Sequence, residues 1–146
     1  MDNIYQWYLD NTHGRVAPAK DYPYNGTEGT CRNITEVAAI LTGYKDLNNS
    51  EFAMVESTAT FGPMVSAVDA STWQLYTGGI LTNCTSQSVD HAIAFVGYNR
   101  DTNPPYWIIK NSWGVDWGME GYIYVEYGTN QCNLTSYPST AFVLET

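Results

Sequence analysis

The chain has 146 residues, of which 44% are hydrophobic and 14% charged, enough apolar material for one packed domain and too much for a disordered chain. Its net charge of −9 would repel a phosphate backbone or an anionic membrane surface, so neither nucleic-acid nor membrane binding is expected. No apolar run approaches the roughly 20 residues of a spanning helix. The first residues lack the basic start and cleavage site of a secretory signal, so a signal is expected upstream if the protein is secreted.

The N-terminal part of the chain shows helical spacing followed by turn residues. Apolar residues at helical spacing predict a helix over residues 2–12, with Gly14 as its stop. The next stretch, up to Cys31, is rich in Gly and Pro, which argues against regular structure. Residues 36–44 return to apolar character.

A second helix is predicted to begin after Ser50, a good N-cap residue, and to end at Gly62-Pro63. The side chains expected on its apolar face are Phe52, Val55 and Ala59. From there the pattern changes to short β-rich runs separated by turn residues. The predicted strands are 64–69, 92–98, 106–110 and 121–127. This order predicts a helical N-terminal portion followed by a largely antiparallel sheet or barrel.

Two of these apolar strands flank the polar loop Asn99–Pro105, which predicts a hairpin. The expected register sets Tyr98 opposite Pro104 and, at the open end, His91 opposite Asn111. An imidazole serves as a base only when its tautomer and orientation are held, and an amide oxygen can accept its far N–H. Asparagine orients the ring without strongly stabilising the imidazolium, which suits a thiolate nucleophile better than a serine.

The residues around this pair allow both a catalytic and a structural interpretation. Trp113 follows Asn111 closely and could cover the His–Asn hydrogen bond, strengthening it by excluding water. Taken alone, His91 after Asp90 at a strand start equally fits a structural histidine. His13 receives no functional role, because it lies near a helix end, where a polar or charged group is favourable.

The segment D-H-A-I-A-F-V-G-Y, followed by Y-W-I-I-K-N-S-W-G-V-D-W-G-M-E-G-Y, resembles the histidine and asparagine regions of papain-like cysteine proteases. Cathepsin L-like members, protozoan ones in particular, are the most similar. The resemblance continues through G-P-M-V-S-A-V-D-A-S, Y-T-G-G-I-L, N-Q-C-N-L-T-S-Y-P-S and an early Y-P-Y, and so covers nearly the whole chain. It implies a truncated α+β papain-like fold, with residues 1–43 in the helical half and 44–146 in the barrel-like sheet half.

The resemblance also implies roles for individual residues. His91 would be the general base and acid, Asn111 its orienter and Trp113 the shield. Trp117 would line the leaving-group side of the cleft, and Asp90 would support the site. The residues implied for the pocket that takes the side chain two positions before the cleaved bond are Met1, Ala67, Val89 and Tyr137. Tyr137 as the floor would favour apolar or aromatic side chains over basic ones, although each of the four alone fits ordinary packing.

The chain has three cysteines, an odd number. By the resemblance, Cys84 and Cys132 form the disulfide of the sheet half, and Cys31 awaits a partner upstream. None of the three lies in the Gln-x-Cys-Gly-x-Cys-Trp context of the nucleophile. The nucleophile, the oxyanion-hole Gln and the propeptide are therefore expected outside this chain. The chain alone is expected to be inactive and to expose apolar surface where the missing half would dock.

Three hypotheses follow: a cysteine endopeptidase represented by one part, a non-catalytic binding or regulatory homologue, or a secreted glycoprotein of other function. The expected partners are polypeptide substrates, the N-terminal half, and propeptide or cystatin-like inhibitors. No metal or organic cofactor is expected, because the His and Cys residues show no ligand spacing. A lysosomal or secreted location is favoured by five glycosylation sequons, at Asn25, Asn33, Asn48, Asn83 and Asn133.

Overall fold

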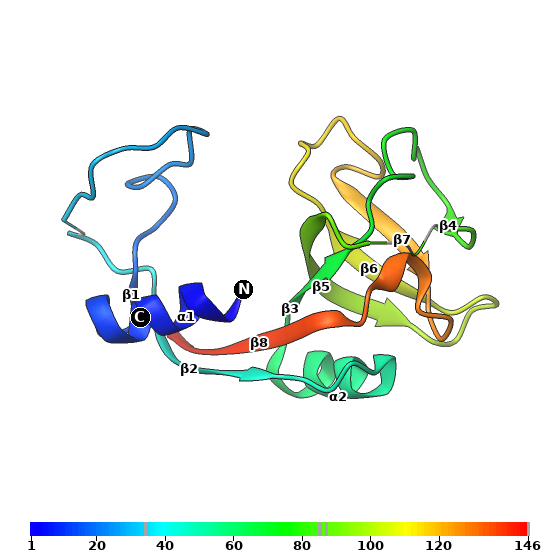
Figure 1. Cartoon of the computed structure of the whole chain (residues 1–146), viewed down its shortest axis with the longest axis horizontal. Coiled ribbons are helices and arrows are strands. Elements are labelled where there is room, and N and C mark those ends of the chain that lie inside the picture. Colours follow the sequence, from blue (N-terminus) through cyan, green and yellow to red (C-terminus); the bar gives the residue numbers. More distant parts are fainter. Residues whose placement is uncertain (34, 85, 87, 146) are drawn as a thin grey trace. The chain divides into compact units, whose positions relative to one another are not determined.

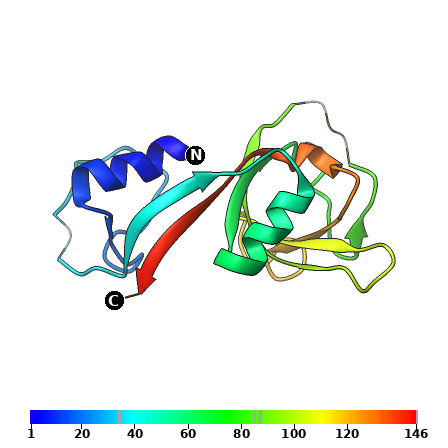
Figure 2. The same cartoon turned by 90° about the horizontal axis from the view of Figure 1, so that it is seen from below.

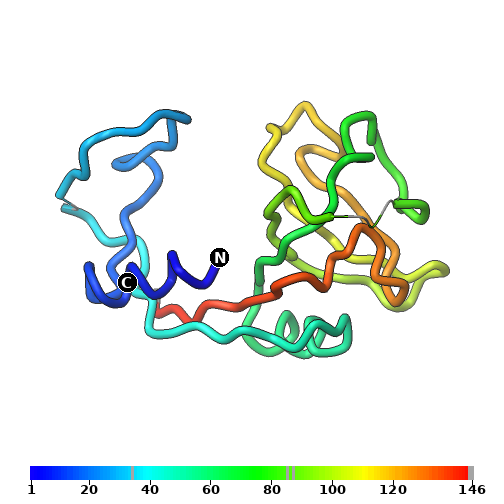
Figure 3. Tube along the Cα trace, in the orientation of Figure 1, coloured from blue at the N-terminus to red at the C-terminus, as the bar shows by residue number. Residues whose placement is uncertain are grey.

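The residues that the computed structural model describes are 1–33, 35–84, 86 and 88–145. They form two compact units, Met1–Lys45 with Ala141–Thr146, and Asp46–Thr140 (Figure 1). The trace leaves the first unit along β2 (Ala39–Asp46) and returns to it along β8 (Ser136–Glu145), as Figure 3 shows. Within the described part of the chain, no helix is long and apolar enough to cross a membrane.

The first unit contains α1 (Asp2–Thr12), which confirms the predicted helix. His13 caps its C-terminus in the left-handed conformation, and the N–H of Gly14 donates to the Tyr8 carbonyl at 2.9 Å. Gly14 has φ 76°, and a Cβ there would lie 1.9 Å from the Leu41 carbonyl oxygen. Only glycine fits at this helix end, because the Leu41 carbonyl on β2 approaches the backbone of residue 14 closely.

After this stop, β1 (Arg15–Val16) pairs antiparallel with β2. The apolar run predicted only as residues 36–44 is thus largely a strand. The strand β2 is also a neighbour of β8 in the sheet order, and the Thr42 hydroxyl donates to the Phe142 carbonyl at 3.1 Å. The rings of Tyr5 and Tyr44 lie 5.5 Å apart and join α1 to β2.

The second unit begins with α2 (Glu51–Phe61), which lies against β3 and β5 (Figure 2). Its predicted bounds are confirmed: Ser50 is the N-cap and Gly62 the C-cap. The predicted apolar face is confirmed for Val55, which is buried, and wrong for Phe52, which is 61% exposed, and for Ala59, which is exposed. The residues that the helix buries are Glu51, Met54, Val55 and Ser57. The Glu51 carboxylate accepts one buried and two part-buried hydrogen bonds, so this face of the helix turns inward.

The remaining strands of this unit are β3 (Met64–Val68), β4 (Ile80–Leu81), β5 (His91–Asn99), β6 (Tyr106–Lys110) and β7 (Tyr122–Glu126). In the sheet these five strands follow β8, in the order β8-β3-β5-β6-β7-β4. The pairings with a described register are antiparallel, except for the parallel pair β4–β7. The four predicted strands and the largely antiparallel α+β architecture are confirmed, whereas β4 and β8 were not predicted as separate strands.

The predicted hairpin of β5 and β6 is confirmed, but its predicted register is wrong. Tyr98 faces Trp107 rather than Pro104, and Ala94 faces Lys110 after a bulge between Phe95 and Gly97. Asn99 pairs with Tyr106, so residues 100–105 stay outside the ladder, and the bulge then shifts the pairing by one residue. Continued past the last pair, this register makes Asn111 a diagonal neighbour of His91. The slip at this end is even, so both side chains keep the predicted face.

A disulfide closes the core of the second unit. Cys84 and Cys132, 48 residues apart in sequence, are bonded, which confirms the predicted pairing. The chain-entropy model assigns a loop of this size about 4 kcal/mol of stabilisation. Cys31 is free and exposed. The disulfide packs into a core formed mainly by alternate side chains of the strands and including Trp73, Phe95, Trp107, Ile109 and Ile123.

Candidate active site

The site lies where two rows of inward-facing side chains end. Alternate residues of a strand share a face, and Phe95 and Ile93 on β5 are both buried. The next inward position on that strand is His91. On β6 the buried residues Trp107 and Ile109 are followed in the same way by Asn111. The alternation of side chains along the two strands therefore places an imidazole and an amide at the same end of one sheet face.

The two side chains are hydrogen-bonded, as the sequence predicted. His91 Nε2 lies 2.8 Å from Asn111 Oδ1. The same oxygen accepts the backbone N–H of Ser112 at 2.8 Å, which fixes the orientation of the amide. An amide oxygen can only accept, so Nε2 carries the hydrogen of a neutral ring and Nδ1 is the nitrogen that can take a proton.

An indole ring shields this hydrogen bond from water. Trp113 and His91 have ring centroids 5.2 Å apart at 37°, and Trp113 is itself 39% exposed. Beneath it, Asn111 is only 8% exposed, and its backbone N–H donates to the Gly121 carbonyl at 2.9 Å. Removing water lowers the local dielectric constant, so the His–Asn hydrogen bond is stronger here than at an open surface.

Two further residues that were predicted from the sequence, Trp117 and Asp90, support the site through contacts with its neighbours. Trp117 packs edge-on against Trp113, with centroids 5.0 Å apart. Asp90 fixes the start of β5: its backbone N–H donates to the Val68 carbonyl at 3.0 Å, and its carboxylate accepts the N–H of Ala70 at 2.9 Å. The position of His91 is thus determined by backbone contacts on one side and by aromatic contacts on the other.

Sequence reasoning missed one member of this aromatic group, Trp73. It is fully buried, stacks on Trp117 at 6.3 Å and 23°, and meets His91 at 6.4 Å and 83°. The Trp117 indole N–H donates to the Trp73 carbonyl at 3.2 Å. Trp73 lies outside both strands of the hairpin, in a turn that no period of 2 or 3.6 residues describes, so its contact with His91 left no sequence signal.

Tyr76 ties the loop that carries Trp117 to the sheet. Its hydroxyl donates to the Gly79 carbonyl at 2.6 Å and accepts the Tyr124 N–H at 3.2 Å. A Cβ at Gly118 would lie 2.6 Å from the Tyr122 carbonyl and 3.2 Å from the Tyr76 ring. The φ of Gly118 is 60°, so glycine is required for the loop to pass this close.

Burial raises the pKa of Tyr76 above its usual value of 10.0. Between the unfolded and folded pKa values the folded chain binds more protons, so stability is unaffected below about pH 10 and falls as the pH rises further. We expect the urea midpoint of the wild type to fall more steeply between pH 9 and pH 11 than that of Tyr76→Phe. Tyr24→Phe, at a fully exposed ring, is the control; equal slopes in all three proteins would contradict this role for Tyr76.

The four residues expected to line a specificity pocket belong to different elements of the structure. Ala67 on β3 pairs with Ser136 on β8, and Val65 pairs with Ser139. Tyr137 therefore lies in a bulge of β8, with φ 57° and a side chain 68% exposed. Val89 is half-buried just before β5. Met1 belongs to the other unit, at the N-cap of α1, so its place in the pocket stays a prediction.

The comparisons with known proteins agree with these features. Residues 1–142 match the family described as papain family cysteine protease. The chain is 46% identical to a cysteine proteinase of Trypanosoma brucei brucei and 42% identical to cysteine proteinase A of Leishmania mexicana. Each alignment covers 98% of this chain but only 33% and 41% of those proteins. The predicted resemblance to protozoan members is confirmed.

Solved structures show the same fold. Digestive procathepsin L2 proteinase of Tenebrio molitor matches with a TM-score of 0.85 and 32% identity, covering 97% of this chain and 46% of that one. The bromelain protease of Ananas comosus matches with a TM-score of 0.84 and 30% identity, covering 97% and 68%. The fold is thus the papain-like one in part. With its histidine–asparagine pair, its disulfide and a family match over residues 1–142, this chain belongs to the papain family of cysteine proteases.

Proposed function

We propose that this chain is the general-base portion of a cysteine endopeptidase. One observation carries the proposal: His91 Nε2 is held by an amide oxygen that a backbone N–H already fixes, so Nδ1 is left to exchange protons. A binding module has no evident need for a histidine oriented and shielded in this way. The whole protein's activity remains a proposal, because the chain spans less than half the length of the curated relatives named above.

In the proposed reaction a thiolate forms an ion pair with protonated His91 and attacks the carbonyl carbon of a peptide bond. The C–N bond breaks as His91 gives its Nδ1 proton to the leaving amine, which leaves a thioester. The neutral ring then takes a proton from water, and the hydroxide formed attacks the thioester. The C–S bond breaks, the acid product leaves, and the thiolate beside protonated His91 is restored. Asn111 keeps the ring in one orientation throughout, and Trp113 keeps bulk water from their hydrogen bond.

The thiolate is proposed to come from a segment outside these residues. Cys84 and Cys132 are bonded to each other. Cys31 lies in an irregular loop, outside the Gln-x-Cys-Gly-x-Cys-Trp context that the family's nucleophile has. The assignment of residues 1–43 and 44–146 to the two halves of the protease likewise stays a proposal, as do an N-terminal half, propeptide or cystatin-like inhibitors as partners.

A secretory route is part of the same proposal. Disulfides persist mainly in oxidising compartments, and the Cys84–Cys132 bridge is present. The sequon asparagines that the structure places at the surface are Asn25, Asn33, Asn48 and Asn83. Asn133 is half-buried, and Thr85 of the Asn83 sequon lies outside the described residues. Together these features support a lysosomal or secreted glycoprotein.

Turnover by the complete protein that carries this chain tests the proposal. We expect it to hydrolyse fluorogenic peptides, and iodoacetamide, which alkylates thiolates, to abolish the hydrolysis. Addition of a reducing agent after alkylation should not restore activity, because the thioether bond is stable. A folded, complete protein that cleaves no peptide would instead support the non-catalytic binding or regulatory homologue.

Tyr137 gives a prediction about specificity. As the floor of the proposed pocket, its ring would accept Leu or Phe two residues before the cleaved bond and would leave a basic side chain without a counter-charge. We expect kcat/KM for Leu to exceed that for Arg by about 10-fold or more, and Tyr137→Glu to reduce this ratio. Tyr24→Glu, at an exposed loop position, is the matched control. A peptide library in which Arg outperforms Leu and Phe would overturn this assignment.

A further inference from the structure

The disulfide and the ring of His91 touch the same side chain. The buried indole N–H of Trp73 donates to Cys132 Sγ at 3.3 Å, while the Trp73 ring meets His91 and stacks on Trp117. A buried indole N–H needs a partner, and within the described residues the disulfide sulfur is the acceptor it has. This sulfur therefore helps to fix the orientation of the Trp73 ring, together with the ring contacts to Trp117 and His91.

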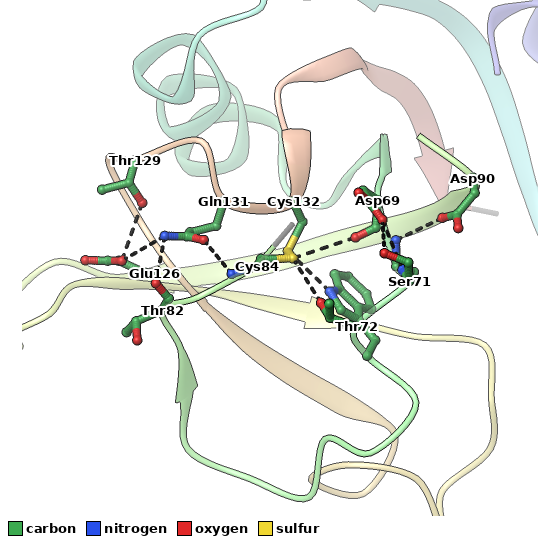
Figure 4. Close-up of a disulfide and its surroundings, with 12 residues drawn as sticks. Asp69, Ser71, Thr72, Thr82, Cys84, Asp90, Glu126, Thr129, Gln131 and Cys132 are labelled. Atoms are coloured by element: carbon green, nitrogen blue, oxygen red, sulfur yellow. Dashed lines mark hydrogen bonds between the residues drawn. A yellow bond between two sulfur atoms is a disulfide. The ribbon is translucent and has the colours of Figure 1, made fainter. Parts of the chain in front are cut away.

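Neighbouring side chains make hydrogen bonds around the disulfide, and Figure 4 labels Thr72, Gln131 and the two cysteines among them. The Thr72 hydroxyl lies 3.5 Å from Cys84 Sγ and is the donor, because a disulfide sulfur has no proton. The Cys84 N–H donates to Gln131 Oε1 at 2.9 Å, and Gln131 Nε2 donates to the Thr82 carbonyl at 2.9 Å. Two neighbouring residues thus contact the two sulfurs directly.

We propose that Trp73 is a positioning residue that couples the Cys84–Cys132 disulfide to the ring of His91. This inference rests on the proposed role of His91 for its catalytic meaning, but the coupling itself is a property of the described unit. Reduction adds two electrons and two protons, supplied by an external dithiol, and gives two separate thiols. Thiol sulfurs cannot stay at bonding distance, so at least one of them must move. Cys132 is fully buried and Cys84 is half-buried, and any shift of Cys132 Sγ would displace the acceptor of the Trp73 indole N–H.

The chain offers a clean spectroscopic test, because it has two histidines, His13 and His91. Nitrogen-15 NMR of the 146-residue chain gives the exchange rate of the His91 Nε2–H with water, and His13 serves as an internal control. Trp73→Phe keeps an aromatic ring and removes the N–H that reaches the sulfur. We expect the His91 Nε2–H to exchange about two- to tenfold faster, the factor that corresponds to the loss of one hydrogen bond.

Trp107→Phe is the matched control. Trp107 is equally buried, but its N–H donates to Glu51 at 2.8 Å and it makes no ring contact with His91 among the described residues. We expect this variant to leave the His91 exchange rate unchanged. Equal acceleration in both variants would overturn the proposal, because the effect would then be a general loss of stability.

Reduction supplies the second arm and stands even if Trp73→Phe fails to fold. In the wild type, a dithiol should accelerate His91 Nε2–H exchange while the Trp107 indole N–H stays protected; in Trp73→Phe it should cause no further acceleration. An unchanged His91 rate, or loss of protection at Trp107 as well, contradicts the coupling. None of these results depends on peptide hydrolysis, so failure of the coupling and failure of the proposed protease function are separate outcomes.

Discussion

Replacing His91 by alanine in the complete protein is expected to lower kcat by at least about 10³-fold. The reason is that no other described group can take the place of Nδ1: Asn111 is an amide without a transferable proton, and Trp113 is an indole. In the proposed reaction the imidazole moves protons and does not hold the substrate, so we expect KM to change little. The measurement is steady-state hydrolysis of a fluorogenic peptide by folded, matched preparations of wild type and variant.

His13→Asn is the control for this prediction. His13 is the other histidine of the chain and caps α1 in the left-handed conformation, which asparagine adopts more readily than most residues. The control should therefore keep both the fold and kcat. A His91→Ala protein that retains more than about a tenth of wild-type kcat would contradict the general-base role.

The largest effect on stability is expected at Glu51. Its carboxylate is 9% exposed and accepts the Trp107 indole N–H at 2.8 Å and the backbone N–H groups of Gly128 and Asn130 at 2.8 and 2.6 Å. Alanine would leave the buried Trp107 indole N–H and two part-buried backbone N–H groups without this acceptor, and it would remove a negative charge from the N-terminus of α2. We expect the free energy of unfolding to fall by about 3–5 kcal/mol, measured by urea denaturation.

Glu56→Ala is the matched control, because it removes a carboxylate from an exposed position of the same helix. Its effect should stay within about 0.5 kcal/mol. Glu51→Gln should fall between the two, because its amide oxygen still accepts hydrogen bonds while its NH₂ group would face an N–H donor. Equal midpoints for Glu51→Ala and Glu56→Ala would show that the three hydrogen bonds do not stabilise the unit.

Local patterns in the sequence predicted the elements well where one physical cause dominates. Gly62 after an apolar helical run marked the end of α2, and the alternation along β3, β5, β6 and β7 marked strands with one buried face. β8 escaped prediction because Pro138 and a positive φ at Tyr137 interrupt its pattern at a bulge.

The pairing details depend on tertiary contacts that a local pattern does not contain. The contact between His91 and Asn111 was predicted through a wrong register and held because the slip is even. The face of α2 was predicted from the apolar residues Phe52, Val55 and Ala59. The interior takes only Val55 of these and selects the face that carries Glu51. A carboxylate is a poor candidate for burial on composition alone, and only its distant donors explain it.

The roles of the site residues rest on two kinds of evidence, the structure and the family resemblance. The structure gives the tautomer of His91, from the fixed amide of Asn111, and the aromatic contacts of Trp113 and Trp117. The implied pocket residues Met1, Ala67, Val89 and Tyr137 come from the family resemblance. The contacts of Trp73 were not predicted from the sequence, because they involve a disulfide and a histidine that only the fold brings together.

The central claim is that His91 is the partner of a catalytic thiolate, and the most direct measurement is the pH dependence of alkylation in the complete protein. A thiol paired with an imidazolium stays ionised well below the usual thiol pKa of about 8.5. Rapid reaction of one cysteine with iodoacetamide at about pH 6, lost in His91→Ala and kept in His13→Asn, is the result predicted here. Alkylation that follows an ordinary thiol titration and is the same in wild type and His91→Ala would contradict the claim.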